Sequence, residues 1–219
     1  MTISNQKKNN FYWITVIIIL FLLPLVVPNL YQMHLINIIC INIIMAIGLN
    51  IVKGFAGQVT VAHIGLYAMG AYSSAILAIN YDLSFWFALP GAIIITVVAG
   101  AIVGIPSFRL QGPYLALATL AFSESLRIYI SVNTDLGATI GISNIPPPKI
   151  FDFSFDNAFH YYYIVIPFTL ISIYFSFKIL KSKLGRAFKA IREDQLAASV
   201  VGINLRLYKT IAFVISAIY

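Results

Sequence analysis

The sequence predicts an all-α protein, a polytopic bundle of transmembrane helices with six spans and a truncated seventh. The first evidence is composition: 60% of the residues are hydrophobic and only 10% are charged, whereas a soluble domain carries about 25% charged residues. The second is that the apolar residues gather in segments of about 20, the length that a helix needs to cross a bilayer. A single water-soluble domain is therefore excluded.

The apolar segments follow one another closely, separated by short breakers of proline, glycine or polar residues. The last segment supplies only ten residues, or about 15 Å of helix against a hydrocarbon core of about 30 Å. We therefore expect the chain to be incomplete, with a seventh span that continues beyond it. No small-residue cleavage site follows the first segment, so we expect it to be retained as a span. The predicted spans are 11–28, 31–52, 59–79, 85–105, 113–132, 160–180 and, incomplete, 210–219.

The basic residues indicate the orientation of these spans. If the amino terminus is cytoplasmic, 12 of the 14 lysines and arginines fall on the cytoplasmic side: four at positions 7, 8, 53 and 109, and eight within 178–209. This distribution follows the positive-inside rule. The outer loop 133–159 then carries three aspartates and one lysine. We therefore predict a cytoplasmic amino terminus and a cytoplasmic loop at 181–209.

The cytoplasmic loop has the pattern of a docking helix. Between Arg186 and Val201 the apolar residues have the spacing of one amphipathic helix. Gly202 is placed to end this helix in the left-handed conformation. A basic amphipathic helix most often lies on a membrane surface. Here the small residues Ala197 and Ala198 favour close docking into a groove on a soluble partner.

The segment 54–65 is unusual for a membrane helix, because it is rich in glycine and carries Gln58, Thr60 and His63. Polar groups and exposed backbone occur at membrane depth only where they are buried in protein or line a cavity. We therefore expect an irregular or broken entry to the third span. Gly57, Gln58 and His63 are candidates for lining a translocation path.

Glu124 and Arg127 form the other candidate polar element within a span. They lie three residues apart and therefore share one face of the predicted helix 113–132. A charge at membrane depth is costly unless it is paired. Two interpretations stay open: a structural ion pair or interface anchor, and a polar part of the translocation path.

The sequence contains no recognisable chemistry for catalysis. His63 has no Cys, Asp or Glu at a metal-ligand spacing, and no nucleophile has a base and an orienting group nearby in the sequence. The phosphate-binding pattern GxxxxGK[ST] does not occur. We therefore predict no catalytic residue, no metal site and no cofactor, and we expect that the protein is not an enzyme.

Three segments carry a resemblance to a known family. They are LNIVKGFAGQVTVAHIGLYAMGAY (49–72), GPYLALATLAFSESLRI (112–128) and GRAFKAIREDQLAASVVGINLRLYKTIAFVISA (185–217). In this order and spacing, they resemble the LivM-type permease of branched-chain amino acid ABC importers. The resemblance covers most of the chain from about Leu49 onward, and the third segment is its most specific part.

The resemblance implies one membrane domain of an ABC importer over residues 1–219, in the bacterial inner (cytoplasmic) membrane. It implies ATP-driven uptake of leucine, isoleucine and valine, with hydrolysis on separate subunits. The implied partners are a second, LivH-like permease subunit, two ATP-binding subunits and a periplasmic amino-acid-binding protein, together with membrane lipid and no nucleic acid. In the loop, Leu196-Ala197-Ala198 followed by Gly202 resembles the family's coupling motif. The residues assigned to ATPase coupling are Gly185, Arg186, Lys189, Arg192, Glu193, Ala197, Ala198 and Gly202.

Departures from the family pattern keep alternatives open. Ala62 stands where the family generally has glycine before the histidine, and Leu136-Gly137-Ala138 stands where Thr-Gly-Gly is usual. Both lie near the predicted entrance, so the same architecture could serve urea, another small amide or another amino acid. A secondary transporter or channel is the alternative of another class. Acidic relays within the spans would favour that class, yet Glu124 is the one carboxylate in the predicted spans.

The predicted orientation can be tested with single cysteines at Ser182 and Asn157 in a variant that lacks Cys40. A membrane-impermeant maleimide is expected to label position 157 from the periplasmic side and position 182 only after the membrane is opened, because the positive-inside rule puts these ends of one helix on opposite sides. Periplasmic labelling of position 182 would contradict the orientation.

Overall fold

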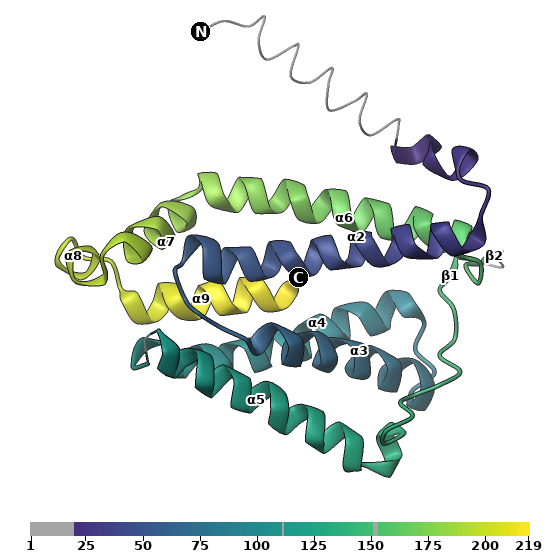
Figure 1. Ribbon diagram of the computed structural model, residues 1–219, viewed down its shortest axis with the longest axis horizontal. Helices are drawn as coiled ribbons and strands as arrows, with labels where there is room; N and C mark the ends of the chain where they lie inside the picture. The colour runs from purple at the N-terminus through teal and green to yellow at the C-terminus, as the bar shows by residue number, and fades with distance from the viewer. Residues whose placement is uncertain (1–19, 111, 151–152) are drawn as a thin grey trace, which may run out of the picture.

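The computed structural model describes residues 20–110, 112–150 and 153–219, and this part of the chain is almost entirely helical (Figure 1). Residues 20–26 are helical. Short π or 3-10 turns, η1 (Ile51–Phe55), η2 (Ile105–Phe108) and η3 (Thr134–Leu136), extend or follow the long helices, and β1 (Lys149–Ile150) pairs antiparallel with β2 (Phe153–Ser154). The helices are α2 (Leu30–Asn50), α3 (Ala62–Asn80), α4 (Phe85–Gly104), α5 (Pro113–Val132), α6 (Ala158–Lys181), α7 (Lys183–Glu193), α8 (Gln195–Val200) and α9 (Leu205–Ile218).

Among the described residues, five helical stretches are long and apolar enough to cross a membrane. Each overlaps one of the predicted spans. The predicted fold class, an α-helical membrane bundle, is therefore confirmed. The number of spans stays a prediction, because α9 has only 14 residues and residues 11–19 of the first predicted span, like Lys7 and Lys8, lie outside the described residues. The five stretches are Leu30–Phe55, Ala62–Asn80, Phe85–Phe108, Pro113–Val132 and Ala158–Lys181.

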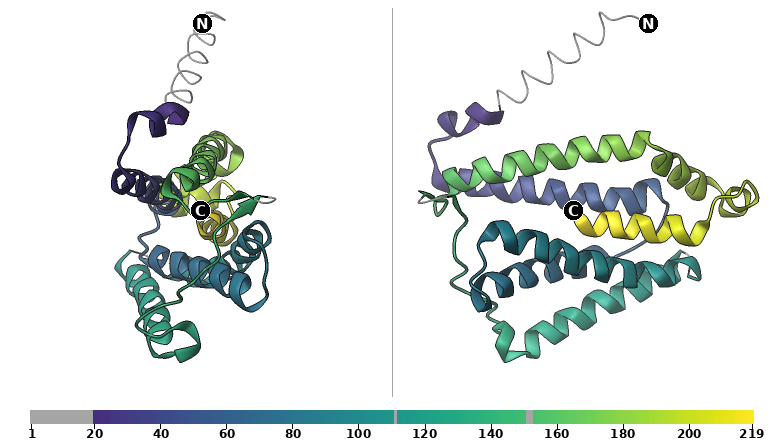
Figure 2. Two further views of the ribbon diagram at one scale, coloured as in Figure 1. Left: turned by 90° about the vertical axis from the view of Figure 1, so that its right-hand side faces the viewer. Right: turned by 180° about the vertical axis from the view of Figure 1, so that it is seen from behind.

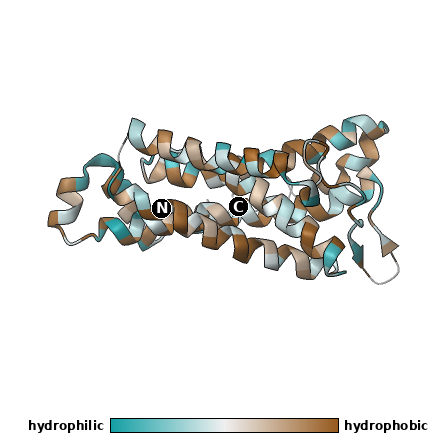
Figure 3. Cartoon of the chain, turned by 90° about the horizontal axis from the view of Figure 1, so that it is seen from below, coloured by the Kyte–Doolittle hydropathy of each residue, from teal (hydrophilic) through white to brown (hydrophobic). Residues whose placement is uncertain are grey.

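The helices form two groups joined by α9. Helices α2 and α6 lie side by side, and α3 packs against both α4 and α5 (Figures 1 and 2). Between these groups, α9 contacts α4 most extensively and also touches α2 and α3. Helices α7 and α8 lie at one end of the bundle and the β1–β2 hairpin at the other (Figure 1). Hydrophobic residues run along the length of the helices in Figure 3.

Glycines on α4 allow α9 to pack very closely. A Cβ atom at Gly100 would lie 2.5 Å from the Cβ of Ala217, and one at Gly104 would lie 3.1 Å from the Cβ of Phe213. Membrane helices associate largely by such van der Waals contact, because lipid offers no hydrophobic drive between them. Phe213 continues into a buried cluster with Ile51, Leu115 and Phe188, among others, so this contact joins α9 to the ends of α2, α5 and α7.

A second cluster joins α2 to α6. Met33, Cys40 and Tyr162 are buried there, and the hydroxyl of Tyr162 donates to the carbonyl of Leu20 (2.6 Å). The side-chain amide of Asn37 donates to the carbonyl of Ala158 (2.8 Å). Cys40 is a free, packed thiol in this cluster, as its apolar sequence context indicates.

The prediction of one continuous helix from Arg186 to Val201 is wrong. Helix α7 ends at Glu193, and Asp194 takes an extended conformation with φ −153° and ψ 116°. Its carboxylate accepts hydrogen bonds from the amides of Leu196 (2.7 Å) and Ala197 (3.1 Å), so it caps the start of α8. An aspartate inside an apolar pattern competes with the helix in this way, and the pattern alone does not register that competition.

The left-handed stop at Gly202 is confirmed. Its φ is +85°, and the amide of the following residue, Ile203, donates back to the carbonyl of Ala198 (3.0 Å). This bond satisfies one of the carbonyls left free at the end of a helix. The chain can therefore reverse and enter α9, whose first turn is capped by the side chain of Asn204.

Replacing Gly100 with alanine is expected to destabilise the bundle, because the added methyl group meets Ala217 across α4 and α9. Overpacking of this kind costs about 1–3 kcal/mol, measurable as the free energy of unfolding in mixed micelles. Gly70→Ala is the matched control, since its nearest neighbour would be the Cγ2 of Thr96 at 3.3 Å. Equal stabilities of the two variants would contradict the close α4–α9 contact.

Candidate functional site

Helix α8 presents an exposed apolar surface at the end of the bundle. Leu196 is 79% exposed, Val200 86% and Val201 74%. We call these three side chains the α8 tip. Neighbouring apolar side chains this far exposed, on a loop outside the predicted spans, are typical of an interaction site. Sequence reasoning named Leu196 within the coupling motif but did not predict that Leu196, Val200 and Val201 form one exposed surface.

The residues assigned to coupling divide into two groups. Ala198 is 3% exposed and packs inside the loop, so its side chain is not on the surface of the described chain, and its assignment to coupling stays a prediction. Gly185 is also buried. A Cβ there would lie 2.2 Å from the carbonyl oxygen of Leu180, so this glycine allows the tight corner between α6 and α7. The exposed members are Arg186, Lys189, Arg192, Glu193, Ala197 and Gly202.

Helix α7 is anchored in the bundle by its apolar face. Phe188 is fully buried and Ile191 nearly so, and the ring of Phe188 meets that of Tyr208 edge-to-face, with centroids 6.5 Å apart. On the same helix, a guanidinium nitrogen of Arg192 donates to the carbonyl of Gly54, and the ammonium group of Lys189 lies over the ring of Phe55. These two cations were expected to face a partner, and both contact η1 of their own chain.

Lys209, on α9, connects its own helix to η2 and to α8. It precedes the predicted seventh span and is only 1% exposed. Its ammonium group donates to the carbonyl of Ser107 in η2 (3.2 Å) and to the side-chain oxygen of Gln195 in α8 (2.9 Å). Burial lowers the pKa of the Lys209 ammonium group, because desolvation disfavours the charged form. Sequence reasoning counted this residue among the loop's basic residues and had no signal for its burial.

The expected irregular entry to the third span is confirmed. After the π-helical turn η1, residues 57–61 are not helical, and α3 begins only at Ala62. The amide of Gln58 donates to the carbonyl of Val52 (3.0 Å), and its side-chain amide donates to the carbonyl of Ala56 (3.0 Å). Gln58 is buried. Polar groups at this depth are therefore satisfied inside the protein, as a membrane requires.

Helix α5 holds the far end of this segment. The amide of Val61 donates to the hydroxyl of Thr119 (3.0 Å), and the hydroxyl of Ser123 donates to the carbonyl of Val61 (3.0 Å). The amide of Gly65 lies within 3.3 Å of the same Ser123 hydroxyl and donates to it. Two hydroxyl groups of one helix thus bond to the backbone at the end of the irregular segment and at the start of α3.

His63 lies at a cavity between four helices. The cavity has a volume of about 310 Å³. The His63 ring is 8% exposed, and its Nδ1 lies 3.1 Å from the hydroxyl of Ser216 on α9. Of the five residues proposed for the translocation path, His63 is the one that lines this cavity. Its other polar or flexible lining residues include Met45, Tyr67, Gly70, Ser74, Thr96, Ser216 and Tyr219.

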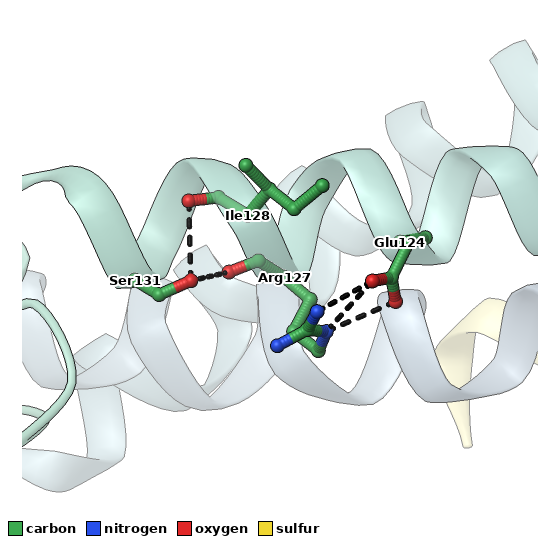
Figure 4. Close-up of polar contacts among 4 residues, drawn as sticks. All are labelled: Glu124, Arg127, Ile128 and Ser131. Atoms are coloured by element: carbon green, nitrogen blue, oxygen red, sulfur yellow. Dashed lines mark hydrogen bonds and ion pairs between the residues drawn. The ribbon is translucent and has the colours of Figure 1, made fainter.

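Glu124 and Arg127 form a hydrogen-bonded ion pair on α5 (Figure 4). The guanidinium donates to both carboxylate oxygens, at 2.9 and 3.1 Å from Nε. The pair does not line the cavity: the side chains of Arg127 and Glu124 are 67% and 49% exposed. It faces outward from the described part of the bundle. This arrangement fits the anchor interpretation, and the role of the pair stays a prediction.

No group of three or more His, Cys, Asp or Glu side chains in the described ranges is arranged to hold a metal ion.

Comparison with known sequences identifies the family. The sequence profile of the branched-chain amino acid transport system / permease component family matches residues 32–219. The chain belongs to this family. Among relatives of this permease is the high-affinity branched-chain amino acid transport system permease protein LivM of Escherichia coli, which is 36% identical over 203 residues, covering 82% of the chain and 48% of the relative. LivM of Salmonella typhimurium is 35% identical over the same shares.

The chain spans about half the length of the curated relatives it matches. No solved structure matches it. Membership of a permease family, together with the apolar helices, makes the chain a multi-pass membrane protein.

The ion pair on α5 can be tested by a double-mutant cycle. Glu124→Gln and Arg127→Gln are each expected to lower the folded yield and thermal stability of the purified full-length protein, because each leaves an unpaired charge at membrane depth. The double variant is expected to be milder than the sum of the two. Ser125→Ala, also exposed on α5, is the control. Strict additivity would show that the two side chains do not stabilise each other.

Proposed function

We propose that this permease is a membrane subunit of an ATP-binding-cassette importer that takes up leucine, isoleucine and valine across the bacterial inner membrane. The observation that carries the proposal is the α8 tip. An exposed apolar surface on a basic loop outside the membrane is suited to dock into a groove on a soluble partner. Family membership and the names of the relatives support the substrate class and the transport role.

The partners we propose are a second, LivH-like permease subunit, two ATP-binding subunits and a periplasmic amino-acid-binding protein. Helix α5 supports the second permease. Most of its surface is not covered by the rest of the described chain, and it carries the exposed pair of Glu124 and Arg127 near its middle. Protein covers an ion pair at such a depth better than lipid does, since protein supplies further hydrogen-bonding groups.

The proposed orientation has a cytoplasmic amino terminus and a cytoplasmic loop at 181–209. The excess of lysine and arginine in this loop supports it. So does the arrangement in Figure 1, in which α7 and α8 lie at the opposite end of the bundle from the segment that bears β1 and β2. Every long helix then runs from one side of the membrane to the other.

The loop is attached to the bundle by buried side chains and hydrogen bonds, which supports a role in transmitting movement. In the proposed mechanism, a groove on the ATP-binding subunit receives Leu196, Val200 and Val201, and closure of that subunit on ATP displaces α7 and α8 together. Lys209 carries the displacement to η2 and α9 through its two hydrogen bonds. Helix α9 in turn bears Ser216 at the cavity. Hydrolysis remains on the partner, and this chain moves its helices between inward-open and outward-open states.

Val200→Asp and Val201→Asp test the docking surface. Each places a charge in an apolar contact, which is expected to weaken association with the ATP-binding subunits by about tenfold or more and to lower leucine uptake in parallel. The readouts are co-purification of the subunits and uptake of radiolabelled leucine. Both side chains are exposed, so membrane insertion should be unchanged.

Lys181→Asp is the control, because it adds a negative charge at an exposed position outside α8. Wild-type association and uptake in both valine variants would make the α8 tip a membrane-surface element and would favour a secondary transporter or channel. Ala198→Trp is unsuitable for this purpose, since Ala198 is buried and its enlargement would disturb the loop itself.

A further inference from the structure

Arg192 links two segments that lie far apart in the sequence. It stands in the last turn of α7, and its Nη1 donates a hydrogen bond to the carbonyl oxygen of Gly54, 138 residues earlier. Gly54 belongs to η1, the π-helical turn that ends the α2 stretch. A carbonyl at the end of a helix lacks a partner within the helix, and here a side chain of the cytoplasmic loop supplies one.

The backbone at Gly57 packs directly on Arg192. Gly57 has φ +66°, and a Cβ atom there would lie 3.0 Å from Cγ and 3.1 Å from Cα of Arg192. Glycine at position 57 is therefore favoured for two reasons: the backbone is left-handed, and a side chain would press against Arg192. One turn earlier in α7, the ammonium group of Lys189 lies 6.0 Å from the centre of the Phe55 ring. Helix α7 thus holds the chain from Gly54 to Gly57 by three separate contacts.

The segment after Gly57 leads to the cavity. Residues 57–61 are irregular, and α3 starts immediately after them with Ala62 and His63. This short segment is fixed to α7 at its beginning and to α5 at its end, through Thr119 and Ser123. The segment is therefore a direct covalent path from the contact of Gly57 with α7 to the first turn of α3, where His63 meets Ser216.

The guanidinium group of Arg192 can serve a second partner at the same time. It carries five N–H donors, and the bond from Nη1 to Gly54 uses one of them. The residue is exposed and lies two residues before Asp194, the cap of α8. A carboxylate or carbonyl of a protein docked on the α8 tip can reach the remaining donors without breaking the bond to Gly54.

We infer that Arg192 is a positioning residue that couples docking of the ATP-binding subunit to the segment 57–61 and so to the cavity at His63. The inference rests on the proposed function, because it requires an ATP-binding subunit at the α8 tip. It assigns Arg192 a different role from Arg186: Arg186 donates to the nearby carbonyl of Lys181, whereas Arg192 reaches η1.

The test uses the assembled transporter, made by co-expressing the full-length protein with the ATP-binding and second permease subunits of its own transport system and supplied with the periplasmic amino-acid-binding protein. It is reconstituted in lipid vesicles for uptake and in nanodiscs for hydrogen exchange. Three quantities are measured: co-purification of the ATP-binding subunits, ATP hydrolysed per leucine taken up in vesicles, and hydrogen exchange of a peptide covering 54–65 with and without those subunits. The variants are Arg192→Ala and Arg192→Lys. Lys183→Ala, which removes an exposed cation from the same helix, is the control.

In Arg192→Ala we expect the ATP-binding subunits to co-purify, and the ATP hydrolysed per leucine to rise by about 2- to 30-fold, the range for residues that carry coupling between sites. Docking should slow exchange of 54–65 in the wild type and in Lys183→Ala but not in Arg192→Ala. Arg192→Lys should behave as an intermediate, because lysine keeps the charge and loses the planar fork of donors.

Gly57→Ala provides a second, independent variant. It leaves the guanidinium group and the α8 tip intact but pushes Arg192 away from the segment, so it should reproduce the raised ratio of ATP to leucine. Gly112→Ala controls for backbone strain, because Gly112 also has a positive φ (+55°) and a Cβ there would meet nothing within 4 Å. Its ratio should stay that of the wild type.

Two results would overturn the inference. One is a wild-type ratio and wild-type exchange in both Arg192→Ala and Gly57→Ala. The other is loss of the ATP-binding subunits from Arg192→Ala, which would make Arg192 a docking contact alone. Failure of the wild-type protein to bind any ATP-binding subunit is a separate outcome, and it would overturn the proposed function together with the inference.

Discussion

Non-helical backbone inside a membrane protein must find its hydrogen-bond partners within the protein, because lipid provides none. The irregular segment between η1 and α3 therefore requires hydrogen-bond partners from the elements packed against it. Thr119 and Ser123 face it from α5, the side chain of Gln58 is buried within it, and Arg192 bonds to Gly54 just before it. The hydrogen bonds that these few peptide groups require thus hold helices α2, α3, α5 and α7 together.

The same constraint explains why α9 has a central position. Helix α3 begins only at Ala62, after the irregular segment, and α9 lies beside its first turn. There the hydroxyl of Ser216 contacts the ring nitrogen Nδ1 of His63. The close approach of α9 to α4 depends on Gly100 and Gly104. Helix α9 therefore joins the two groups of helices and contacts α7, η1 and η2 at the end of the bundle that carries α7 and α8. The loop is thus connected to the cavity along both α9 and the irregular segment.

Sequence reasoning succeeded where the signal was local. The left-handed stop at Gly202, the irregular entry after Gly54 and the i, i+3 pair of Glu124 and Arg127 each depend on residues only a few positions apart. It failed where the partners are distant. Nothing near Lys209 indicates that its ammonium group is buried against the carbonyl of Ser107, 102 residues earlier. The outward direction of the α5 ion pair depends on which face of α5 meets α3, which the sequence of one helix does not determine. The break at Asp194 was local and could have been found, because aspartate is among the strongest helix caps.

The basic residues of the loop show that one set of charges can meet two different requirements. The positive-inside rule depends on the number of lysines and arginines near a span, and by that count the whole loop is cationic. A docking partner meets only the charges that remain free after folding. Lys209 is buried, and the guanidinium of Arg206 lies over the ring of Phe108. Some of the basic residues that predict the orientation therefore also make contacts within the folded chain. The surface left for a partner is then defined more by the apolar side chains of the α8 tip than by net charge.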